Sequence, residues 1–165
     1  MRIWKRFKLQ AGGMSNVESA WIRPVLRALG HTIQAASIYD VRTIPVVTGI
    51  QPWNSQFDQP SQIEHEPARL GSNLAPAAQL HERMRATGAP WGILTNGRRW
   101  RLYHHTIPGK LDVFYEVDLP ALIEWSISEK NDQQQKRKRE TGIEVADAFK
   151  YFYLFFRHQA FTGEP

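Results

Sequence analysis

The stretch Trp91-Gly-Ile-Leu-Thr-Asn-Gly-Arg-Arg-Trp-Arg-Leu-Tyr103 decides the fold of this chain. It contains Asn96-Gly97, a strong signal for a two-residue hairpin turn in which both central residues need a positive φ. After the turn, side chains alternate between the two faces of the returning strand, so Trp100, Leu102 and His104 share one face and Arg99, Arg101 and Tyr103 share the other. The stretch therefore predicts a β-hairpin with strands at 91–96 and 98–104.

Further elements are expected on both sides of the hairpin. Apolar periodicity, capping residues and turn signals predict them in this order: a helix at 16–29, a strand at 43–48, a loop at 51–67, a helix at 75–86, the hairpin, a strand at 113–117 and helices at 119–127 and 143–161. Pro24 should kink the first helix or move its start, and Asp118 should cap the helix that follows it. This alternation predicts an α/β fold, a mixed β-sheet flanked by helices with a C-terminal helical extension.

Composition narrows the classes of function. The chain has 165 residues, a formal net charge of +5 and no cysteine. A basic surface favours polyanions such as DNA through counterion release. No stretch approaches the roughly 20 apolar residues that span a bilayer, so no membrane partner is expected. The absence of cysteine fits a cytoplasmic location.

The order of these segments predicts a division of the chain into four parts. They are a basic N-terminal tail at 1–14, an α/β domain at 15–127, a charged linker at 128–141 and the start of a helical region at 142–165. The last region carries apolar residues on nearly all sides of the helix between Phe149 and Phe161. Such a helix should be buried, against a further part of a truncated protein, a partner protein or a second copy of the chain.

The hairpin resembles a stretch of the amino-terminal nuclease-like domain of restriction–modification enzymes. These are single-chain type II enzymes that carry an endonuclease and an adenine methyltransferase, and related type I subunits and phage-defence methyltransferases. The motif residues are Thr95, Asn96, Gly97 and Trp100. Other segments that resemble the family follow in the same order, at 21–30, 85–88, 114–119 and 147–153. The resemblance covers most of residues 17–161.

The resemblance implies a restriction-endonuclease-like fold of the PD-(D/E)XK type. In that family an Asp and a second carboxylate hold Mg²⁺, which activates water for hydrolysis of a phosphodiester, and a lysine stabilises charge on the phosphate. The family's Glu-x-Lys element ends an apolar strand, where this chain has Gly49 and Gln51. Moreover, no lysine occurs between Lys8 and Lys110. The cutting site is therefore expected to be degenerate.

Two further family positions are also altered or displaced. Asp40 is the only carboxylate between the first helix and the strand that ends near Gly49, and it stands closer to that strand than the family pattern implies. Gln79 matches the glutamine of a Gln-x-x-x-Tyr element, whose tyrosine position is Arg83 here. No cofactor and no metal site are expected unless relocated acids such as Glu64 and Glu66 hold Mg²⁺.

Three readings of function stay open at this point. The first is a DNA-associated, catalytically inactive nuclease-like domain of a restriction–modification or phage-defence system, which would dock on a methyltransferase or specificity protein. The second is a divergent Mg²⁺-dependent endonuclease, and the third is a non-functional remnant of a truncated restriction enzyme.

Candidate DNA-contacting residues are Arg83, Arg85, Arg98, Arg99 and Arg101, which could equally be solvated charges at a sheet edge.

Overall fold

The computed structural model describes Trp4, Phe7 and residues 16–31, 46–60, 74–105, 112–131 and 145–162. The described part of the chain does not include Asp40, Glu64 and Glu66, nor most of the expected linker at 128–141. Within it, the expected helices and strands are present, with boundaries that shift by a few residues.

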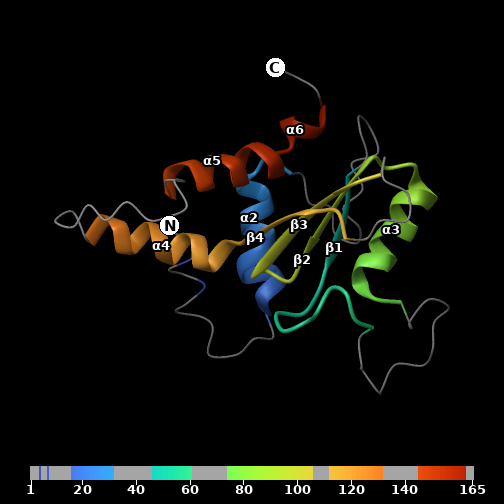
Figure 1. The fold of residues 1–165 in the computed structure, drawn as a ribbon, viewed down its shortest axis with the longest axis horizontal. Coiled ribbons are helices and arrows are strands. Elements are labelled where there is room, and N and C mark those ends of the chain that lie inside the picture. Colours follow the sequence, from blue (N-terminus) through green and yellow to red (C-terminus); the bar gives the residue numbers. More distant parts are fainter. Residues whose placement is uncertain are drawn as a thin grey trace.

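A mixed sheet forms the centre of the molecule (Figure 1). Its strands are β1 (Val46–Ile50), β2 (Trp91–Thr95), β3 (Arg99–His104) and β4 (Tyr115–Asp118), in the order β1-β2-β3-β4. β1 and β2 are parallel and are connected through helix α3 (Pro76–Thr87), whereas the other two pairs are antiparallel. The expectation of an α/β fold with a mixed sheet and flanking helices is thus confirmed.

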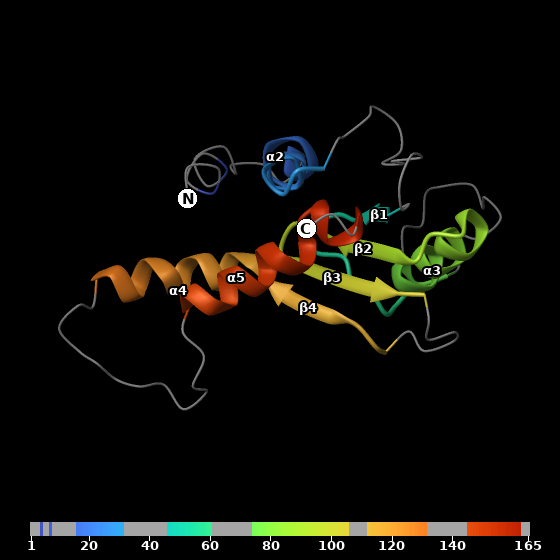
Figure 2. The ribbon, with the colours of Figure 1, turned by 90° about the horizontal axis from the view of Figure 1, so that it is seen from above.

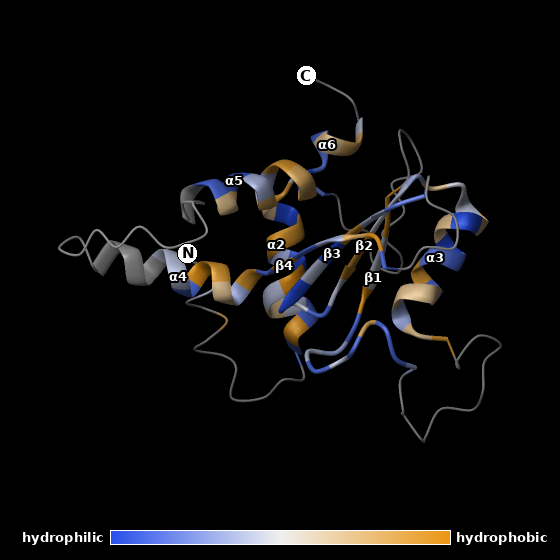
Figure 3. Cartoon of the chain, viewed as in Figure 1, coloured by the Kyte–Doolittle hydropathy of each residue, from blue (hydrophilic) through white to orange (hydrophobic). Residues whose placement is uncertain are grey.

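Helices cover both faces of the sheet, and each face has its own hydrophobic core (Figures 1 and 2). On one face lie the π-helical turn η2 (Glu18–Ile22), α2 (Arg23–Ala28), α4 (Leu119–Asn131), α5 (Val145–Phe156) and α6 (Gln159–Thr162). Helix α3 covers the other face. Figure 3 shows apolar residues on the sheet and on the helix surfaces that meet it. As the alternation predicted, Trp100 and Leu102 join the first core and Tyr103 joins the second.

The first helix follows the expected span but changes its winding. Pro24 falls in the first turn of α2, where its missing N–H is tolerated. The residues before it form η2. Two residues of the expected N-terminal tail are part of the folded unit, because Trp4 and Phe7 are buried and pack against Trp21 with ring centroids 5.0 and 5.6 Å away.

The C-terminal region differs from the single helix expected at 143–161. It consists of α5 and α6, separated at Arg157 and His158. The His158 N–H donates a hydrogen bond of 2.8 Å to the Leu29 carbonyl, which ties this break to the end of the first helix. Upstream, α4 continues to Asn131, four residues beyond the expected end at 127.

Burial of α5 is one-sided among the described residues, and the expected cover from a further part of the protein, a partner or a second copy stays a prediction. Phe152 and Phe156 are buried against Trp100, which they meet edge to face. The other side of the helix stays open, and its half-exposed residues are Tyr151 (47%), Tyr153 (48%), Leu154 (44%) and Phe155 (44%).

Candidate functional site

The motif residues of the hairpin build the turn itself. Thr95 Oγ1 accepts a hydrogen bond of 3.0 Å from the Gly97 N–H. Asn96 Oδ1 accepts hydrogen bonds from the N–H groups of Arg98 and Arg99, at 3.1 and 2.8 Å. Of the two central turn residues, Asn96 and Gly97, only Gly97 has a positive φ, of +85°, so the expected turn with two positive φ values is wrong. The Asn96 side chain supplies the missing backbone contacts, as an Asx turn does.

The turn is also fixed from outside. The indole N–H of Trp21 donates a hydrogen bond of 2.6 Å to the Gly97 carbonyl, and that of Trp100 reaches the same oxygen at 3.3 Å. Asn96 Nδ2 donates to the carbonyl of Ser55 in the loop after β1, at 3.1 Å. Thr95, Asn96 and Trp100 are all buried. These contacts give the motif a structural role, in which it locks the turn to the first helix and to the loop after β1.

The position expected for the second metal-binding carboxylate is closed by packing. Gly49 lies in β1 opposite Leu94 of β2 and faces α3. A Cβ at Gly49 would lie 2.9 Å from Leu94 Cδ1 and 3.6 Å from Leu80 Cδ1. A longer acidic side chain would therefore enter an apolar core, where an unpaired carboxylate is strongly disfavoured.

The lysine position and the glutamine of the helix are also engaged in structure. Gln51 follows β1, and its N–H donates a hydrogen bond of 2.8 Å to the Thr95 carbonyl. Gln79 uses its side-chain amide to donate to the Leu74 carbonyl at 2.7 Å, next to the start of α3. Within the described ranges, no group of three or more His, Asp or Glu side chains is placed to hold a metal ion.

The five candidate arginines fall into three places. Arg83 and Arg85 are exposed near the end of α3, and Arg85 pairs with Glu82 at 2.6 Å. Arg98 and Arg99 follow β2 at the hairpin turn, where Arg98 pairs with Asp118 at 2.8 Å. Because α3 ends before β2 starts, these two pairs lie at opposite ends of a five-residue strand, about 16 Å long. The sequence alone does not separate these two pairs.

Arg101 is not a surface residue, so the sequence interpretation of this arginine as an exposed phosphate contact is wrong. Its side chain is 5% exposed and makes a two-pronged ion pair with Asp58, at 2.6 and 2.9 Å. It also donates to Glu116 and to the Tyr103 hydroxyl. The guanidinium stacks over the Phe114 ring, 3.9 Å from its centroid. We call Arg101, Asp58, Glu116 and Tyr103 the Arg101 cluster.

Electrostatics in the Arg101 cluster favour the ionised pair. The hydrogen bonds from Arg101 hold the pKa of Asp58 below its ordinary value, against the effect of burial. Burial by itself would lower the pKa of Arg101, but its bonds to Asp58, Glu116 and Tyr103 outweigh this and raise it. Burial raises the pKa of Tyr103. The guanidinium is thus fully paired within the protein and has little capacity left for a phosphate.

The two carboxylates of this cluster were not predicted from the sequence. Asp58 comes from the loop after β1 and Glu116 from β4, which are 43 and 15 residues away from Arg101. One signal was available: Arg101 shares a strand face with Tyr103, which the structure shows to be buried. A guanidinium buried on that face requires acidic partners.

Comparison with known proteins provides no match, since no family model, curated protein or solved structure is detectably similar to the chain. Across the residues that the structure describes, no helix has the length and apolar character required to cross a membrane.

Proposed function

We propose that this chain is a restriction-endonuclease-like domain that associates with DNA but does not hydrolyse it, in a cytoplasmic restriction–modification or phage-defence system. The observation that carries the proposal is the packing at Gly49, where a Cβ would already meet Leu94 at 2.9 Å. Together with Gln51 at the lysine position, it removes both groups that the nuclease reaction needs there. The mixed sheet with helices on both faces is compatible with the fold that the family resemblance implies.

The proposed DNA contacts are electrostatic and independent of sequence. Arg83 and Arg85 are exposed at one end of β2, and Arg98 and Arg99 lie at the other. The distance between these ends, about 16 Å, is shorter than one turn of B-DNA, about 34 Å. We propose that one duplex touches both pairs. Intramolecular acids already neutralise part of this charge at Arg85 and Arg98, so the proposed binding is weak.

The test is fluorescence anisotropy of a labelled 25-base-pair duplex at several salt concentrations. Four phosphate contacts predict a slope of log affinity against log salt near −3.6, since each contact contributes about −0.9. Replacing both Arg83 and Arg99 by serine should make the slope less steep by the contribution of about two contacts. The control replaces Arg27 and Lys150 by serine, which removes the same charge elsewhere. An equal loss in both variants, or no binding at low salt, would refute the proposed surface.

The proposal includes a protein partner on α5. Tyr151, Leu154 and Phe155 are half exposed, which is unusual for neighbouring large apolar residues on one helix. We expect a methyltransferase or specificity subunit, or a second copy of the chain, to cover them. Sedimentation velocity over a hundredfold concentration range separates the second copy from a different partner, because only self-association depends on the concentration of this chain alone.

A further inference from the structure

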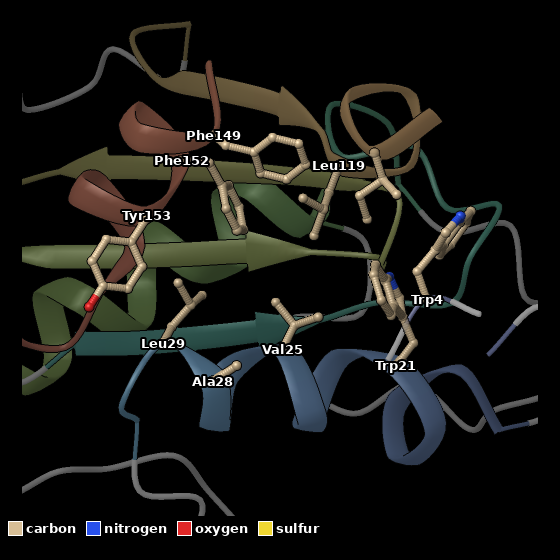
Figure 4. Close-up of a pocket in the computed structure, with 10 residues that line it drawn as sticks. Trp4, Trp21, Val25, Ala28, Leu29, Leu119, Phe149, Phe152 and Tyr153 are labelled. Atoms are coloured by element: carbon tan, nitrogen blue, oxygen red, sulfur yellow. The ribbon is translucent and has the colours of Figure 1, made fainter. Parts of the chain in front are cut away.

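An apolar cavity of about 270 Å³ lies between α2, α4 and α5, on the sheet face opposite α3 (Figure 4). Aromatic side chains form much of its wall, and they are Trp4, Trp21, Phe149, Phe152 and Tyr153. Val25 and Leu29 from the first helix and Leu119 and Ile123 from α4 complete it. The space opens to the surface at Ala28 and Tyr153, so it is a recess that a small molecule can reach.

The lining determines the chemistry of that occupant. None of the ten described residues that line the cavity is charged. The Trp21 N–H is already used by the Gly97 carbonyl, and the Tyr153 hydroxyl points away from the other labelled side chains (Figure 4). A nucleobase would leave its polar edge without partners here, at a cost that disfavours binding. The described part of the lining therefore favours an uncharged and mainly apolar group.

The volume of the cavity and its aromatic wall indicate the size and shape of the ligand. A dry apolar cavity of about 150 Å³ accepts one benzene ring. The present volume of about 270 Å³ is less than twice that and lies just below the range of drug-sized pockets, about 300–1,000 Å³. Aromatic side chains favour edge-to-face and offset contacts with another ring. We propose that this cavity binds an uncharged two-ring aromatic group.

Access to the cavity runs along the exposed side of two helices. Ala28 at the end of α2 is exposed, and Tyr153 on α5 is half exposed, although both line the cavity. Trp4, Trp21 and Phe152 form its buried interior. A ligand can therefore enter beside Ala28 without opening the sheet. The site is also separate from the proposed DNA contacts, which lie on α3 and at the hairpin turn.

The test titrates the full chain with naphthalene while methyl resonances are followed by NMR. We expect saturable shifts at Val25, Leu29 and Ile123. Ala28→Trp, which places a bulky ring at the entrance, should weaken the affinity at least tenfold. Ala121→Trp is the matched control, because Ala121 is an exposed alanine on α4 that does not line the cavity. It should leave the affinity unchanged.

Val25→Phe provides a second block at the inner wall, should Ala28→Trp fail to fold by near-ultraviolet circular dichroism. The proposal is overturned by an absence of methyl shifts up to the solubility limit of naphthalene. It is also overturned by equal weakening in the Ala28 and Ala121 variants. Tighter binding of octanol than of naphthalene would refute the aromatic class. DNA affinity is measured in parallel, and its presence or absence does not bear on these outcomes.

Discussion

Replacing Arg101 by methionine separates the role of this arginine in stability from a role in DNA contact. The guanidinium makes two hydrogen bonds to Asp58, one to Glu116 and one to Tyr103. Breaking a fully buried ion pair from one side costs about 3–5 kcal/mol. Asp58 is 59% exposed and can regain water, so part of this cost is recovered. We therefore expect a loss of about 2–3 kcal/mol in the free energy of unfolding.

The assay is urea denaturation at pH 7, with Arg98→Met as the matched control. Arg98 forms an exposed pair with Asp118, so the same substitution there should change the midpoint little. DNA affinity should respond in the opposite way, with Arg98→Met weakening it and Arg101→Met leaving its salt slope unchanged. If Arg101→Met is as stable as the unmodified chain but binds DNA less tightly, the assignment of Arg101 to the interior fails.

Acid should reduce the difference in the free energy of unfolding between Arg101→Met and the unmodified chain. The pKa of Asp58 is lowered in the folded state by Arg101, relative to an ordinary value of 3.8. The ion pair thus contributes fully above that value, and its contribution is lost as the pH falls through the lower folded pKa. Urea midpoints measured from pH 6 to pH 2.5 should therefore converge for Arg101→Met and the unmodified chain. A difference that stays constant would exclude Asp58 as the stabilising partner.

Three other substitutions test the geometry around the site. Gly49→Ala should destabilise the fold by about 1–3 kcal/mol in urea, because its Cβ would overpack against Leu94; an unchanged midpoint would mean that the position has room for a side chain. Gly97→Ala should cost about 2–3 kcal/mol, from its φ of +85° and from contacts at 2.9 Å with the first helix, and a neutral effect would contradict the locked turn. Asp118→Ala should cost about 1 kcal/mol, because Asp118 Oδ1 accepts the Ala121 N–H at 3.0 Å; Asp118→Asn retains an acceptor and should recover most of it.

Local patterns predicted the elements of this fold well. The helix at 75–86 and the strands of the hairpin follow from apolar spacing and from Gly88, which adopts a left-handed conformation at the end of α3. The capping role of Asp118 was predicted correctly as well. These features depend on residues close together in the sequence. The alternation along β3 also assigned Trp100 and Tyr103 to the correct opposite faces.

Features set by distant contacts escaped prediction. The burial of Arg101 depends on Asp58, 43 residues away. The break between α5 and α6 depends on a hydrogen bond from His158 to Leu29, and the burial of Trp4 depends on its contact with Trp21. The predicted turn was wrong because the Asn96 side chain accepts hydrogen bonds from the N–H groups of Arg98 and Arg99, in place of the expected backbone turn. A single sequence shows which residues can make such contacts but not which partners they find.

The most direct test of the proposed function is incubation of the purified chain with supercoiled plasmid and Mg²⁺ or Mn²⁺, at a protein concentration that saturates duplex binding in the anisotropy assay. The closed position at Gly49 and the glutamine at position 51 predict a plasmid that is bound but remains supercoiled. Metal-dependent nicking or linearisation that disappears with Asp40→Asn or Glu64→Ala would contradict this, and would assign the chain to the divergent nucleases.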